Sequence, residues 1–192
     1  MKRQIRKKVY ETNSSSTHAI CIVKDGYELK DHVDFHTGEY GWECEEYVDL
    51  NDKASYLITA ILSMDKEYAD EKLEKLKSIL DENKITYTIP ELDVKSWEYG
   101  SKKCYYYDIE DNYINHVEEL KTWLEDLLSD SDKLFRYLFG DSIIITGNDN
   151  DDSYRDRMLI AEGEESTDWG TYTLYGDLKP EFDKYEIYEK GN

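Results

Sequence analysis

The densest run of residues that could perform chemistry lies near the start of the chain, between two short β-like segments. Hydroxyl and amide side chains are followed there by one imidazole, in the order Thr12, Asn13, Ser14, Ser15, Ser16, Thr17 and His18. A serine nucleophile needs a base within hydrogen-bond reach and a third group that orients the base. A turn could bring the imidazole of His18 to a serine hydroxyl. The chain has no GxSxG elbow, however, and no third member can be assigned.

The same run has two other interpretations. Its backbone amides could form a concave site for an anion such as a phosphate or a nucleotide. Short polar side chains also satisfy nearby backbone groups in tight turns, which requires no ligand. We therefore predict no catalytic residue, and we keep Thr12–His18 as an alternative ligand-binding loop.

Metal chemistry has weaker support in the sequence. His32 and His36 are four residues apart, a spacing that can share a zinc ion on a helix, but two nearby glycines favour a loop there. The acidic run 149–153 starts like a calcium loop, but Tyr154 stands where that loop requires glycine. The sequence therefore predicts no metal and no cofactor.

Charge is the strongest compositional signal. The 192 residues include 44 acidic and 24 basic side chains, and the formal net charge is −20. A field of that sign repels nucleic acid and membrane surfaces and attracts basic partners, although it also serves solubility alone. Carboxylates on a rigid helix can imitate the phosphates that a nucleic-acid-binding groove holds. We predict an interface with a basic protein at the carboxylates in and after the strongest helical pattern: Glu118, Glu119, Glu125, Asp126, Asp130 and Asp132.

The elements that must position these groups follow from hydrophobic periodicity. Residues 4–23 predict a β-hairpin around the polar loop. Helical spacing predicts helices over about 51–64, 66–83, 111–129 and 131–139. Further strands are expected at 45–50, 85–89, 103–109, 142–146, 157–161, 171–175 and 185–188. We expect an α+β fold with an N-terminal β-hairpin, central helices and C-terminal strands in a mostly antiparallel sheet. The length suits one domain over 1–192, with a division into 1–110 and 111–192 as the alternative.

Cysteine usage and the first residues bear on the compartment. Cys21, Cys44 and Cys104 are odd in number and form no CxxC pair, which argues for a reducing environment. The basic residues 1–8 precede polar residues, and no apolar run has the length of a signal or membrane segment. We expect a cytoplasmic protein.

The segment Val9–Ile20 resembles the N-terminal signature of small, largely uncharacterised proteins of bacteriophages and prophages, chiefly in Firmicutes. That signature has a hydrophobic residue, Glu/Asn-Thr-Asn, a serine triplet or quartet and then His, and here it reads VYETNSSSTHAI. Ala19 follows His18 where the signature often has Ser. The resemblance covers 12 of 192 residues and supplies no activity. It implies a phage-encoded protein in the host cytoplasm.

Small acidic phage proteins are often inhibitors of host defence, including anti-restriction and anti-CRISPR proteins that occupy DNA- or RNA-binding grooves. By this resemblance we expect a protein-binding inhibitor that mimics nucleic acid on a basic host or phage protein, such as a nuclease. It would bind neither nucleic acid nor membrane. The alternative is a nucleotide- or phosphate-binding domain or enzyme that uses Thr12–His18. A weaker alternative is an ADP-ribosyltransferase. The residue types at Arg6, Ser15-Ser16-Thr17 and Glu162-Gly163-Glu164 resemble those that such enzymes use.

Overall fold

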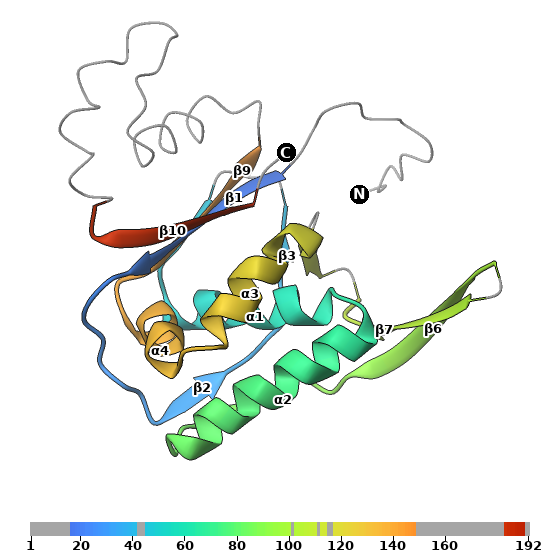
Figure 1. Cartoon of the computed structure of the whole chain (residues 1–192), viewed down its shortest axis with the longest axis horizontal. Coiled ribbons are helices and arrows are strands. Elements are labelled where there is room, and N and C mark those ends of the chain that lie inside the picture. Colours follow the sequence, from blue (N-terminus) through green and yellow to red (C-terminus); the bar gives the residue numbers. More distant parts are fainter. Residues whose placement is uncertain are drawn as a thin grey trace, which may run out of the picture.

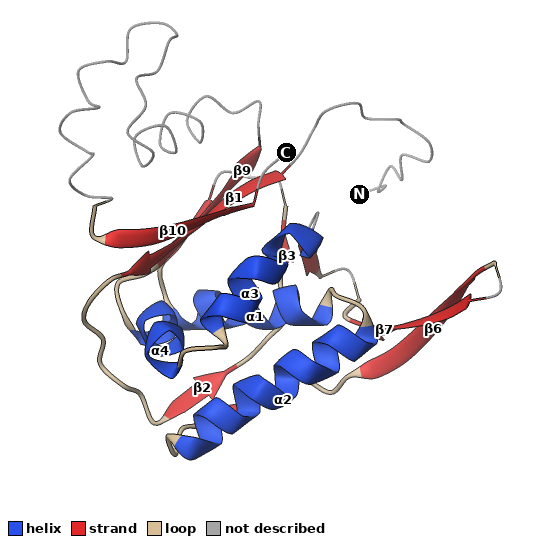
Figure 2. Ribbon diagram, in the orientation of Figure 1, coloured by secondary structure: helices blue, strands red, loops and turns tan. Residues whose placement is uncertain are grey.

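The computed structural model describes residues 16–41, 45–100, 102–110, 112–114, 117–148 and 183–190. Within these ranges the helices form a central group with strands on several sides of it (Figure 1). Helices and strands are mixed along the chain (Figure 2), and the largest sheet is antiparallel throughout. The predicted α+β class is confirmed.

The largest sheet joins the two ends of the described chain. Its strand order is β10–β1–β9–β4, formed by Tyr185–Lys190, Ser16–Val23, Ile143–Asn148 and Glu45–Tyr47. Residues 18–21 of β1 pair on both sides, with β10 and with β9. The second arm of the predicted N-terminal hairpin is therefore a central strand of this sheet. Its first arm, together with the strands predicted at 157–161 and 171–175, lies outside the described residues.

Side chains of β1 alternate between two apolar layers, as they must on a pleated strand. Ile20 and Ile22 belong to the main core, together with the helices. Ala19 and Cys21 belong to a smaller buried cluster on the other face of the sheet. Because both faces are buried, β1 is apolar along most of its length.

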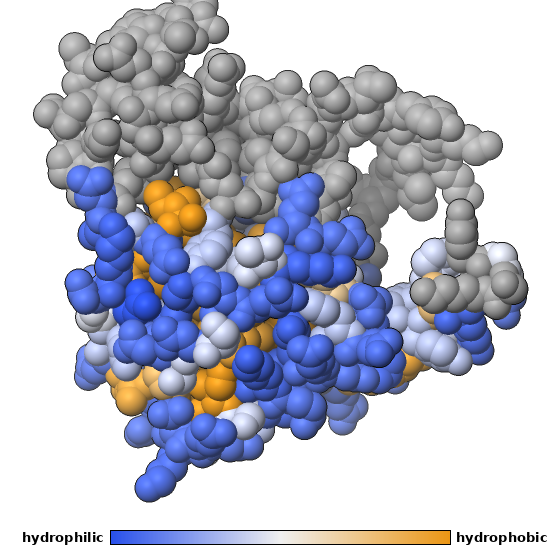
Figure 3. All heavy atoms as spheres, viewed as in Figure 1, coloured by the Kyte–Doolittle hydropathy of each residue, from blue (hydrophilic) through white to orange (hydrophobic). Residues whose placement is uncertain are grey.

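α2 (Lys66–Glu82) is amphipathic as predicted. Asp65 caps its first turn by accepting a hydrogen bond from the backbone N–H of Tyr68, and a stripe that includes Leu73, Leu76 and Leu80 is buried. The surface on this side of the molecule is largely hydrophilic, with apolar residues visible between the polar ones (Figure 3). α2 therefore has one face in the core and one in solvent.

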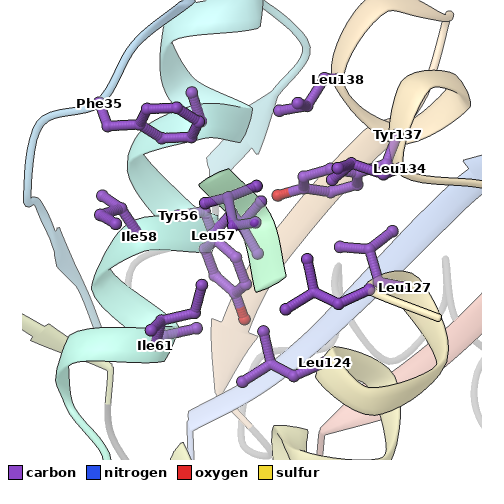
Figure 4. Packing of buried hydrophobic residues seen from close by; sticks show 14 of the residues in the cluster. Phe35, Tyr56, Leu57, Ile58, Ile61, Leu124, Leu127, Leu134, Tyr137 and Leu138 are labelled. Carbon is purple, nitrogen blue, oxygen red and sulfur yellow. The ribbon is translucent and has the colours of Figure 1, made fainter. Parts of the chain in front are cut away.

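α1 (Leu50–Leu62) is the centre of the core. Every residue from 56 to 62 is buried, as expected for a helix surrounded by other elements. It begins at Leu50 after the N-cap Asp49, one residue before the predicted start at 51. α2, α4 (Ser131–Phe139) and β2 (His32–Asp34) contact it. Leu124, Leu127, Leu134 and Tyr137 converge on Tyr56 and Leu57 in Figure 4.

The predicted helix over 111–129 is wrong in its first half. Tyr113–Ile114 is strand β8, which pairs in parallel with β3 (Glu39–Tyr40). Val117–Leu120 is a 3₁₀ helix, η1, and α3 covers Lys121–Leu127. The predicted apolar stripe is nevertheless buried, because a strand, a 3₁₀ turn and a helix can each direct apolar side chains to the same core.

A hairpin extends away from the helices (Figure 1). It consists of β6 (Asp93–Tyr99), which the sequence did not predict, and β7 (Lys102–Asp108), which it did. β7 lies against α2, where the Tyr107 hydroxyl donates to Asp70 and where Asp65 forms a β-bridge with Tyr106. A further short strand, β5 (Thr86–Thr88), pairs in parallel with β2.

Candidate functional site

The polar run near the N-terminus ends inside the core. No side chain of residues 12–17 is among those that the structure describes. His18 is fully buried, with Nε2 3.1 Å from the carbonyl oxygen of Gly41 and Nδ1 2.8 Å from the hydroxyl oxygen of Tyr56. A carbonyl can only accept, so Nε2–H donates to Gly41. In the neutral tautomer that carries its proton on Nε2, Nδ1 accepts a hydrogen bond from the Tyr56 hydroxyl.

His18 is the first member of a buried aromatic cluster. Ring centroids are 5.8 Å apart between His18 and Tyr56, 5.8 Å between Tyr56 and Trp123, and 5.5 Å between Trp123 and Tyr137. The Tyr137 hydroxyl donates to the backbone carbonyl of Lys53, and burial raises the pKa of Tyr137 well above its usual value. These contacts fix β1, α1, α3 and α4 together. They give His18 a structural role and no support to a ligand loop ending at this residue.

Lys53 is a second ionisable group inside the core. It lies on α1, is 2% exposed, and donates from Nζ to the carbonyl oxygen of Gly140 at 2.6 Å. Gly140 ends α4, where unpaired carbonyl groups attract a cation. Burial lowers the pKa of Lys53 to about 8, against the opposing charges of Asp141 and Asp49. Lys53 thus joins two helices at a cost in charge desolvation.

Three of the six predicted interface carboxylates have structural partners. Lys133 Nζ lies 2.7 Å from Asp126. Asp130 caps α4 by accepting a hydrogen bond from the backbone N–H of Asp132, and Asp132 pairs with Arg136 Nε at 2.9 Å. These three acids stabilise the α3–α4 connection, so they are weaker candidates for a partner interface.

Lys133 also connects α4 to the last strand. Its Nζ lies 2.9 Å from Glu186 and 2.9 Å from the Tyr188 hydroxyl, both on β10. Burial lowers the pKa of the Lys133 ammonium, but hydrogen bonds to Asp126, Tyr188 and Glu186 outweigh burial and raise the pKa overall. This cluster is a structural clamp between the sheet and the helices.

The other three predicted acids, Glu118, Glu119 and Glu125, are exposed on η1 and α3. Glu125 is close enough to Tyr68 of α2 for its charge to act on the phenol. Sequence reasoning found Glu125 but not the acids of α2 that approach the same ring. Those acids come from another helix, and only the packing of α2 beside α3 places them there.

The charges of three carboxylates act on the Tyr68 phenol. Burial raises the pKa of Tyr68 to about 12, and the charges of Glu125, Glu71 and Asp65 add to the effect. The Tyr68 hydroxyl lies 3.4 Å from the carbonyl oxygen of Lys121, which ties α2 to α3. We call Asp65, Tyr68, Glu71 and Glu125 the Tyr68 face. It joins α2 to α3, and two of its acids also have structural partners, because Asp65 caps α2 and Glu71 pairs with Lys72.

Two lysines at this surface contact the Tyr68 ring, and one of them also pairs with an acid. Lys72 Nζ lies 4.6 Å from the Tyr68 ring centroid and 2.7 Å from Glu71. Lys121 Nζ lies 5.5 Å from the same ring centroid. The side chain of Glu71 is still 68% exposed, so a partner can reach its carboxylate.

Two cavities lie beside the hairpin. The larger has a volume of about 670 Å³ and lies between the start of α2 and β7. It is lined by Asp65, Lys66, Glu67, Asp70, Lys103, Cys104 and Tyr105. The smaller, about 240 Å³, is at the base of the hairpin, where Glu91, Asp93, Asp108 and Glu110 contribute to its lining. Asp65 belongs to both the larger cavity and the Tyr68 face, so the acidic surface continues toward the hairpin.

The described residues contain no group of three or more His, Cys, Asp and Glu side chains that could hold a metal ion. The ring nitrogens of His32 lie 2.8 Å from Thr86 Oγ1 and 3.0 Å from Asp34, within short strands. His36 is exposed in the loop after β2. The two histidines therefore do not share a helix, in agreement with the loop that the glycines favoured.

Comparisons with protein-family models, curated proteins and solved structures find no match to this chain. In the described part of the chain, no helix combines the length and the apolar character needed to cross a membrane. Cys21 and Cys104 are free cysteines, the first buried and the second partly buried. Cys44 lies outside the described residues.

Proposed function

We propose that this chain is a non-enzymatic, phage-encoded acidic protein that binds and inhibits a basic protein, specifically a nuclease of host defence. The observation that carries the proposal is that the charges of Asp65, Glu71 and Glu125 act on Tyr68 from two helices that its hydroxyl links, beside Lys72 and Lys121 at the same ring. Carboxylates at fixed spacing present negative charge to a groove as phosphates do. A tyrosine among them offers the aromatic area that is enriched at interfaces.

Further observations support the same function. The net charge of −20 attracts a basic partner over long distances and raises its association rate. The resemblance of Val9–Ile20 to phage proteins supports the origin. Of the alternative site at Thr12–His18, the one side chain that the structure describes is His18, which is buried with both ring nitrogens in hydrogen bonds.

The test uses two double charge reversals of equal size. Glu71→Lys with Glu125→Lys alters the Tyr68 face, and Asp25→Lys with Glu28→Lys alters an exposed loop elsewhere. Each pair changes the net charge equally, so a difference between them reports a local interface and not the overall field. The probes are purified restriction endonucleases and RNA-guided nucleases, with cleavage of labelled DNA and binding to the chain as readouts.

We expect inhibition of a nuclease only when the chain is added before DNA, because the two compete for one groove. Binding should weaken at least about tenfold when salt rises from about 0.05 to 0.3 M, since exposed charges are screened. The Tyr68-face variant should lose at least about thirtyfold in affinity, and the loop variant less than about threefold. Equal losses for the two variants, or inhibition that ignores the order of addition, would contradict the proposal.

A further inference from the structure

β6 is exposed along its length. The strand is 7 residues long, and each of its side chains from 93 to 98 is exposed. Val94 is 47% and Trp97 52% exposed, and Tyr105 on the adjacent β7 is 49% exposed. Apolar side chains that gather on a surface mark interaction sites. The hairpin extends away from the helices, so a partner can approach it without meeting them (Figure 1).

The outer edge of the hairpin belongs to β6. Among the described strands, β6 pairs with β7 and with no other. β7 is attached to the body through Tyr107 and Tyr106, which leaves β6 on the outside. A two-stranded sheet is marginally stable alone, and an open edge presents backbone groups to which another strand can bind.

The charges of the hairpin indicate what binds there. Its strands carry three acids and three bases, so they have no net charge in a chain of net charge −20: Asp93, Glu98 and Asp108 against Lys95, Lys102 and Lys103. Two copies of the chain repel each other over the acidic surface, but not where two hairpins meet. A basic partner would be attracted to the acidic surface instead. The hairpin therefore suits a second copy of the chain.

We propose that two copies dimerise by antiparallel pairing of β6 with β6, around a two-fold axis at Ser96. Ser96 is the middle residue of the strand, so this register pairs all of it. Lys95 then lies opposite Trp97 of the partner copy, and Val94 opposite Glu98 of the partner copy. The Lys95 ammonium pairs with Asp108 of its own hairpin, and its aliphatic stem can pack against the indole across the strands. The same surface on both copies makes the interface isologous and closes the assembly at two.

Neighbouring registers are less favourable or shorter. A two-fold axis at Lys95 would place two ammonium groups opposite each other, and like charges in that position destabilise a sheet. An axis at Trp97 would place Ser96 opposite Glu98 and would leave the first residues of β6 unpaired. The charge pattern and the length of the strand together favour the register centred on Ser96.

Salt should affect this dimer in the opposite direction to the basic-partner complex. The acidic bodies repel each other, and the Debye length falls from about 30 Å at 0.01 M to about 8 Å at 0.15 M salt. Screening therefore strengthens the dimer, whereas it weakens binding to a basic protein. The dimer does not depend on the proposed inhibitory function, and either can fail alone.

The experiment is analytical ultracentrifugation of the full chain over a concentration series at low and high salt. The variants are Ser96→Asp, Ser96→Lys and a mixture of the two. Thr122→Asp on α3 is the control that matches the charge of Ser96→Asp at another exposed site. Each Ser96 variant alone should weaken the dimer at least about tenfold by opposing two like charges. The mixture should restore a heterodimer, and the control should dimerise like the wild type. Circular dichroism confirms that each variant is folded.

Three results would overturn the proposal. One is a wild-type chain that stays monomeric at about 0.2 mM in about 0.5 M salt, where repulsion is screened. Another is a dimer unaffected by either Ser96 variant, which would place the interface elsewhere. The third is a tighter dimer for Ser96→Lys alone, because that result belongs to the register in which residue 96 faces Glu98.

Discussion

Lys53→Met tests whether the core contains a charged lysine at neutral pH. Methionine has a similar length and fills the same space without charge. Lys53 is 2% exposed, and its pKa is lowered from 10.5 to about 8 by burial. The substitution removes the desolvation cost together with the hydrogen bond to the carbonyl of Gly140. The lowered pKa reports the net effect of desolvation and of the interactions made by the charged form, so varying the pH isolates the cost of holding the charge.

The magnitude follows from linkage between protonation and folding. Below pH 8 the folded and unfolded states both hold the Lys53 proton, and the lowered pKa costs about 3 kcal/mol of stability. Between pH 8 and 10.5 the folded state releases the proton and the unfolded state keeps it, so the wild type gains stability as pH rises. At pH 10 the remaining cost is about 1 kcal/mol. The stability of the wild type relative to Lys53→Met should therefore increase by about 2 kcal/mol from pH 7 to pH 10.

The assay is urea unfolding of both proteins at pH 7 and at pH 10. Tyrosines also begin to ionise at pH 10, but they are common to both proteins and cancel in the difference. Lys75→Met, at an exposed site on α2, controls for the loss of one positive charge. A difference between wild type and Lys53→Met that stays within about 0.5 kcal/mol across this pH range would refute the reasoning.

Two other substitutions test the packing of α4. Gly140→Ala should lower the free energy of unfolding by about 3 kcal/mol, because the added Cβ would lie 2.6 Å from the carbonyl oxygen of Arg136. A loss below about 1 kcal/mol in urea unfolding would show that the contact relaxes easily. Lys133→Met should cost about 1–2 kcal/mol at pH 7, a modest value because Asp126 and Glu186 are partly exposed and solvent screens them. Lys133 lowers the pKa of Asp126, so the stability that this ion pair contributes is complete above about pH 4 and declines as the pH falls further. If Lys133→Met lowers the free energy of unfolding equally at pH 7 and pH 3, this reasoning is wrong.

Helices α1, α2 and α4 could be predicted from sequence because the signals that define them are local. The stripe of α2 and the uniformly apolar run of α1 lie within single segments, and those segments have the predicted type. β8 could not be predicted in this way. Its pairing with β3 joins segments far apart in the chain, and the apolar residue Ile114 fits a helical pattern as well as a strand. Periodicity shows which residues are buried more reliably than it shows the backbone that buries them.

The hairpin had a signal that could have been used. Gly100 has φ +62, a conformation that favours glycine at a tight turn, and Tyr99 pairs with Lys102 across that turn. A two-residue connection between aromatic-rich segments is typical of a β-hairpin. β6 was missed because its side chains are exposed on both faces, so it lacks the alternation of buried and exposed residues that identifies a strand.

The residue types of the candidate sites were visible in the sequence, but their roles were not. His18 has the chemistry of a base, yet its buried side chain contacts Tyr56 and Gly41, which lie 38 and 23 residues further along the chain. Glu125 is on the predicted helix, but Glu71 joins it only because Tyr68 packs α2 against α3. In both cases the deciding contacts are between distant segments. A single sequence does not specify which distant segments meet.

The acidic surface and the neutral hairpin are consistent with two kinds of association on one chain. A body of net charge −20 opposes self-association, so a dimer requires a region where that charge is absent, and the hairpin provides one. A basic partner requires the negative charge itself, and the Tyr68 face on α2 and α3 is the site that we propose for it. Added salt should therefore shift the chain from complexes with basic proteins toward dimers. Reversing charges at the Tyr68 face should weaken the first association and leave the second intact, because that face lies on helices and the dimer is formed by β6.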